Sequence, residues 1–86
     1  MSSEGIKQMA TIRQAQRAIN RAGIPVELVR GEGYHYFVYD NPEKGIFDTI
    51  SVYVPYTNQL SVERWVEEAK DAYDTIYREW NNAFLA

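Results

Sequence analysis

Acidic side chains recur at near-helical intervals in the last third of the chain. On a helix, spacings of four, four and three residues place side chains on one side. Such a row imitates the regular negative charge of a nucleic-acid backbone, so it is suited to occupy a basic groove on a nucleic-acid-binding protein. A solvated helix face, with local pairing to nearby Lys and Arg residues, is the alternative that stays open. The row consists of Glu63, Glu67, Asp71 and Asp74, with Glu68 beside it.

Tyrosine is the second residue type whose use points to contact chemistry, with seven copies in 86 residues. Tyr34, Tyr36 and Tyr53 lie in segments rich in aromatic and β-branched residues, which are typical of strands. A tyrosine offers a large rigid contact area with a polar tip, and it is favoured at protein interfaces. We therefore expect these three residues to bind a partner protein or a second copy of the chain. Burial of the same rings in the core is the alternative that stays open.

Arginines form a further row near the start of the chain. Arg13, Arg17 and Arg21 follow one another at strict four-residue steps, which places them on one side of a helix. They are suited to bind phosphate or a partner's carboxylates. Pairing with the acids of the second helix, or plain solvation, is the alternative.

Catalysis is disfavoured by the residue types that are present. The chain has one histidine, His35, and no cysteine, and it contains no P-loop, G-x-S-x-G or G-x-G-x-x-G pattern. No set of acid, base and nucleophile can be named. We therefore expect a protein that is not an enzyme and that uses no cofactor and no metal.

The elements that must position these residues follow from hydrophobic spacing and turn signals. Both helical segments show apolar residues at steps of three and four, and Ser61 is suited to cap the second one. We expect the final segment NNAFLA to fray. The expected order is a helix over residues 6–22, strands over 25–30, 34–39 and 46–54, and a helix that begins after Ser61.

Burial then sets the architecture. We expect one α+β domain over residues 1–86, an α-β-β-β-α two-layer sandwich in which two helices cover one face of a three-stranded antiparallel sheet. In the third strand the even positions read as the core side, with Asp48 as an exception, so Tyr53 lies on the open side. In residues 34–39 both parities are aromatic or apolar, so the buried parity stays open.

Charge is divided unevenly along the chain, although the net charge is −3. Residues 1–30 carry five basic and two acidic side chains, whereas residues 31–86 carry four basic and ten acidic ones. Nucleic-acid affinity depends on contacts between cations and phosphates, so the acidic part disfavours direct nucleic-acid binding. It favours a bacterial protein partner with a basic nucleic-acid-binding surface. The sequence has neither a run of about 18 apolar residues nor a signal-peptide core, so we expect a cytoplasmic protein without a membrane partner.

Two resemblances bear on function. The α-β-β-β-α order resembles the double-stranded-RNA-binding domain, whose phosphate contacts come from lysines at the start of the second helix. Glu63, Glu67 and Glu68 stand in that region here, which disfavours RNA binding by the same mode.

The stretches VELVRGEGYHYF, SVYV and LSVERWVEE are similar to a family of small proteins carried by bacteriophages, prophages and other mobile elements. The resemblance covers about residues 18–69, and it assigns no role to a particular residue. It implies a small acidic phage protein, comparable in size and charge with anti-CRISPR and anti-restriction proteins. The function expected is inhibition of a bacterial nucleic-acid-handling defence protein by occupation of its basic site. A homodimeric interaction module that uses the open sheet face, and an RNA binder, are the alternatives.

Overall fold

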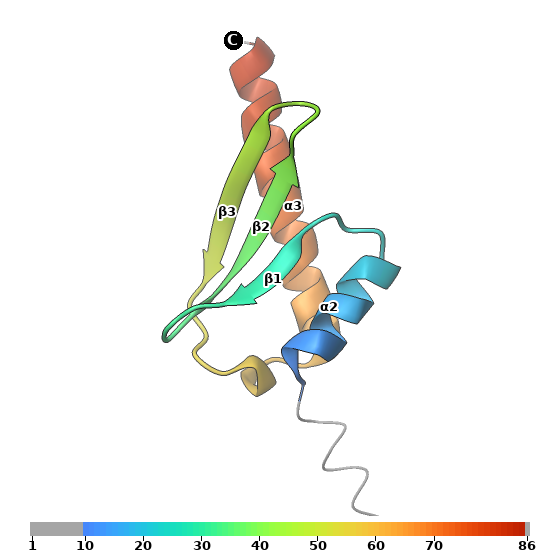
Figure 1. Cartoon of the computed structure of the whole chain (residues 1–86), viewed down its shortest axis with the longest axis vertical. Coiled ribbons are helices and arrows are strands. Elements are labelled where there is room, and N and C mark those ends of the chain that lie inside the picture. The colour runs from blue at the N-terminus through green and yellow to red at the C-terminus, as the bar shows by residue number, and fades with distance from the viewer. Residues whose placement is uncertain (1–9, 86) are drawn as a thin grey trace, which may run out of the picture.

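The structure of the protein is a computed structural model that describes residues 10–85 (Figure 1). The order of its elements confirms the predicted helix, three strands and helix. The elements are α2 (Ile12–Arg21), β1 (Glu27–Arg30), β2 (His35–Asn41), β3 (Ile46–Val52), the short 3-10 helix η1 (Thr57–Gln59) and α3 (Val62–Leu85).

The three strands form one antiparallel sheet in the order β1-β2-β3, and both helices lie on the same side of it (Figure 1). Helix α2 contacts β1 and α3, while α3 runs behind β2 and β3 and contacts both. The predicted α+β two-layer architecture is therefore confirmed. One face of the sheet forms the core with the helices, and the other is not covered by any element in the described part of the chain.

Strand register settles which parity of β2 is buried. Phe37 lies opposite Leu28 on one side and Ile50 on the other, and all three side chains point toward the helices. Because side chains alternate along a strand, Tyr36 and Val38 point to the opposite face. The core is completed by α3, which buries Trp65, Ala69, Ala72 and Ile76, and by Ala15 and Ile19 of α2.

Helix α2 begins later than the sequence spacing predicts. The Thr11 hydroxyl accepts a hydrogen bond from the backbone N–H of Gln14, and the Gln14 side chain accepts one from the backbone N–H of Thr11. This reciprocal N-terminal cap makes Ile12 the first helical residue, so Ala10 and Thr11 are not helical. The rest of the predicted extension, residues 6–9, lies outside the described residues.

Helix α3 begins as predicted but continues further. The Ser61 hydroxyl accepts from the backbone N–H of Arg64 at 3.1 Å, which confirms the expected cap. The expectation that the segment NNAFLA frays is wrong for residues 81–85, because the helix runs through Leu85; Ala86 lies outside the described residues.

The two outer strands of the sheet, β1 and β3, are bonded to the helices in different ways. Gln16 of α2 covers β1: its side-chain oxygen accepts from Leu28 N at 2.6 Å, and its amide nitrogen donates to Val26 O at 3.1 Å. On β3, the Asp48 carboxylate accepts from Thr49 N at 2.8 Å and from Trp80 Nε1 at 3.2 Å. Asp48, the exception in the apolar alternation, therefore bonds to the backbone of its own strand and to α3.

Candidate protein-binding face of the sheet

The uncovered side of the sheet carries the three tyrosines singled out from the sequence. Tyr36 projects from β2, Tyr34 lies just before that strand, and Tyr53 follows β3. The Tyr34 ring centre is 5.8 Å from that of Tyr36 and 6.4 Å from that of Tyr53. Tyr53 is 84% exposed, and the other two side chains are half-buried. We call this surface the tyrosine face.

A glycine in the β1–β2 connection makes room for this ring cluster. A Cβ atom on Gly31 would lie 2.7 Å from Cε1 and 2.8 Å from Cζ of Tyr34. The Gly31 N–H also donates to Tyr34 O at 2.8 Å, which closes the turn. Glycine at this position therefore allows the Tyr34 ring to lie against the backbone and toward Tyr36 and Tyr53.

The strand positions of the tyrosine face carry negative charge and no positive charge. Glu27 lies opposite Val38, and Asp40 lies opposite Phe47, so both acids point to the same side as Tyr36. Phe47 is 62% exposed and adds a further ring to this side. Among the outward positions of β1, β2 and β3 there is no Lys or Arg.

The acidic row of α3 points away from the tyrosine face. Trp65, Ala69, Ala72 and Ile76 turn one side of α3 toward the sheet. At 3.6 residues per turn, the carboxylates lie on or near the opposite side of the helix. Glu63, Glu67, Asp71 and Asp74 are all exposed, and Glu68 is half-buried. The structure thus separates the two groups of predicted partner-binding residues by the whole thickness of the molecule.

Arg64 neutralises part of the acidic row. Its guanidinium lies 2.9 Å from a Glu68 carboxylate oxygen and 3.5 Å from a Glu67 oxygen. Within residues 10–81 these are the ion pairs that the structure contains, so Asp71 and Asp74 are not paired. Exposed pairs of this kind are worth about 0–1 kcal/mol, so the row keeps much of its negative potential.

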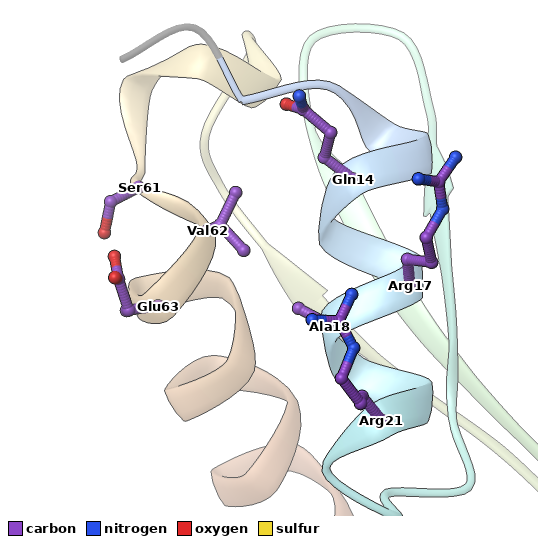
Figure 2. Close-up of a pocket in the computed structure, with 7 residues that line it drawn as sticks. All are labelled: Gln14, Arg17, Ala18, Arg21, Ser61, Val62 and Glu63. Carbon is purple, nitrogen blue, oxygen red and sulfur yellow. The ribbon is translucent and has the colours of Figure 1, made fainter. Parts of the chain in front are cut away.

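A groove of about 420 Å³ separates the basic row of α2 from the start of α3 (Figure 2). Figure 2 shows Ala18 and Val62 pointing toward each other across the groove, with Arg17 and Glu63 on opposite sides of it. The row formed by Arg13, Arg17 and Arg21 is exposed and makes no ion pair with α3 in the described part of the chain.

His35 lies in the core, with no exposed surface. Its Nδ1 is 2.6 Å from the Val54 carbonyl oxygen, and its Nε2 is 2.8 Å from the Thr57 hydroxyl. A carbonyl only accepts, so Nδ1 carries the proton and, in the neutral ring, Nε2 accepts from Thr57. The centre of its ring lies 5.0 Å from that of the Trp65 ring, and Trp65 Nε1 donates to Thr57 O. Both ring nitrogens are occupied by the fold.

Three tyrosine rings pack in sequence between β2 and α3 on the core side of the sheet. The Tyr73 ring lies 5.4 Å from that of Tyr39 and 6.0 Å from that of Tyr77. Burial raises the pKa of Tyr73, and the charges that Tyr39, Tyr77 and Asp74 carry when ionised raise it further. The neutral phenol is thus the form that the folded protein favours at this position.

Neither a metal-binding cluster nor a membrane-spanning helix is found among the described residues. Residues 10–85 bring together no group of three or more His, Asp or Glu side chains that could hold a metal ion. The described helices also include none with the length and hydropathy that a bilayer-spanning segment needs.

Comparison with known proteins adds no relative. No protein-family model matches the chain, and neither a curated protein nor a solved structure is significantly similar to it. The similarity to phage proteins therefore stays a prediction.

Proposed function

We propose that the protein is a non-enzymatic binding protein of the phage or mobile-element type. It inhibits a bacterial nucleic-acid-handling defence protein, as anti-CRISPR proteins do, by covering a basic site with its tyrosine face. The observation that carries the proposal is a sheet face on which clustered aromatic rings lie beside acids and no cations.

The rings supply contact area and a preference for cations. Large exposed apolar groups gathered on one face mark interaction surfaces, and Phe47 and Tyr53 are both more than half exposed. A tyrosine ring attracts an Arg or Lys head group placed over its face. A basic protein surface provides such groups at high density.

Charge favours this partner over the two alternatives. Phosphates would meet Glu27 and Asp40 on the tyrosine face without a compensating cation at the strand positions, which disfavours RNA. A dimer formed through this face would bring the acids of both copies into one interface, with no Lys or Arg at the strand positions to pair with them. A cationic partner supplies the missing positive charge.

The proposal is tested by protein capture from a nuclease-treated bacterial lysate. The wild-type chain is compared with a variant that carries Tyr36→Ser and Tyr53→Ser. We expect the wild type to retain a basic protein that added DNA or RNA displaces. The variant should bind it at least about 30-fold more weakly, because a central aromatic contact contributes about 2 kcal/mol or more.

Two matched variants locate the contact. Tyr77→Ser removes an exposed tyrosine from α3, and Glu67→Lys with Asp71→Lys reverses charge on the opposite side of the molecule. Both should leave capture nearly unchanged at about 0.15 M salt, where charges far from the contact are screened. Loss of capture only on charge reversal would move the contact to the acidic row. A dimer in sedimentation, or a gel shift with duplex RNA at low salt, would instead favour the corresponding alternative.

A further inference from the structure

A second binding site lies at the other end of the fold, between the β2–β3 hairpin and the last turns of α3. The hairpin contributes Tyr39 and Ile46, and the helix contributes Ile76, Tyr77 and Trp80. They surround a cavity of about 130 Å³. An apolar cavity of comparable size accommodates a benzene ring in another protein.

The walls of this cavity are held in place by contacts within the protein. Asn41 Nδ2 donates to the Tyr39 hydroxyl at 3.0 Å, and Tyr39 also packs edge-on against Tyr73. On the other wall, Trp80 Nε1 donates to Asp48 at 3.2 Å. Aromatic rings that are fixed from both sides form a preorganised apolar site, which reduces the entropy cost of binding.

Lys44 gives the cavity a preference for negative charge. Of the described residues that line it, Lys44 alone is charged. The turn fixes its backbone, because Lys44 N donates to Asn41 O at 3.2 Å and Asn41 Oδ1 lies within 3.3 Å. No carboxylate in the described part of the chain forms an ion pair with Lys44. The ammonium group is therefore available to a ligand anion.

We propose that this cavity binds a small carboxylate that carries one aromatic ring or a branched aliphatic chain. The ring or chain occupies the space between Tyr39, Tyr77 and Trp80, and the carboxylate pairs with Lys44. Asn81, which also lines the cavity, adds an amide that can donate to the same anion. The site is independent of the tyrosine face, so either proposal can fail without the other.

The test is an NMR titration of the full chain with phenylacetate and with 3-methylbutanoate. We expect saturable shifts confined to the hairpin and the last turns of α3. Phenylacetamide, which has the same ring but no charge, should bind about fivefold more weakly, as expected for the loss of one exposed ion pair. A short peptide that ends in phenylalanine with a free carboxylate identifies the source: tighter binding of the peptide assigns a chain terminus, and tighter binding of the free acid assigns a metabolite-sized ligand.

Two variants complete the test. Lys44→Met keeps the aliphatic stem and should weaken phenylacetate binding by about fivefold, down to the level of the amide. Lys70→Met removes an exposed cation from another part of α3 and should leave the affinity unchanged. No saturable shift at the cavity residues with either acid would overturn the proposal. Equal binding of acid and amide would overturn it as well.

Discussion

His35 connects three segments that are far apart in the sequence. It hydrogen-bonds to the Val54 carbonyl after β3 and to Thr57 in η1, and its ring lies against Trp65 of α3. The arrangement satisfies a fully buried polar ring, which would otherwise be costly to remove from water. His35 therefore acts as a structural link between β2, the segment that follows β3, and α3.

Replacement of His35 by phenylalanine should strongly destabilise the fold. An aromatic ring of slightly larger volume is kept, but the Thr57 hydroxyl and the Val54 carbonyl lose their partner. Leaving buried polar groups unpaired costs about 1–3 kcal/mol each, so we expect a loss of about 2–4 kcal/mol in the free energy of unfolding. Urea denaturation measures it, with Thr57→Ser as the control that keeps the hydroxyl. Wild-type stability of His35→Phe would show that the two hydrogen bonds contribute nothing net.

Tyr73 makes the free energy of unfolding depend on pH in the alkaline range. Because burial raises its pKa in the folded protein, the unfolded chain releases this proton at a lower pH. The free energy of unfolding therefore falls as the pH rises above about 10, the ordinary tyrosine value. Tyr73→Phe keeps the ring contacts and has no proton to lose. Between about pH 8 and about pH 10.5 the variant should lose less stability in urea denaturation than the wild type; equal losses would contradict the shift.

At the scale of the elements, Gln16 holds α2 against the edge of β1. Gln16→Leu leaves Leu28 N and Val26 O without side-chain partners at the edge of the sheet. We expect a loss of about 1–3 kcal/mol in urea denaturation and new self-association in sedimentation, because an open strand edge accepts another strand. Asn20→Ala is the matched control, since it removes only the 2.9 Å bond between Asn20 and Gln16. A Gln16→Leu protein as stable and monomeric as the control would show that β1 needs no cover.

How far the sequence predicts these elements depends on how local their causes are. The open side of β3 is predicted, because apolar and polar residues alternate there. The buried parity of β2 is not, because both sides carry aromatic rings, and only pairing of Phe37 with Leu28 and Ile50 decides it. The start of α2 is misplaced because apolar spacing continues before Thr11. The Thr11–Gln14 capping pair was the local signal that marks the true start.

The candidate site was predictable only where residue composition and local sequence pattern determine it. The composition singles out Tyr34, Tyr36 and Tyr53, and the fold places them together on one side. Sequence reasoning assigned both these tyrosines and the acidic row of α3 to partner binding, and the structure places the two groups on opposite sides of the molecule. No local sequence pattern predicts the roles of Gln16 and His35 or the cavity beside Lys44, because all three depend on contacts between distant segments.

At the scale of the whole molecule, the fold presents different chemistry on its two broad sides. The tyrosine face combines rings with acids, whereas the helical layer presents the arginine row of α2 and the acidic row of α3. A partner that covers one side leaves the other accessible. Occupation of a basic site by the tyrosine face therefore does not consume the charged helical surface.

The cover that Gln16 places on β1 also limits how copies of this protein can assemble. Because Leu28 N and Val26 O are occupied, β3 is the edge that is more accessible to a further strand. Two molecules that paired through β3 would leave only their covered β1 edges outside. Such a pair is closed, and the cover on β1 opposes its extension into fibrils.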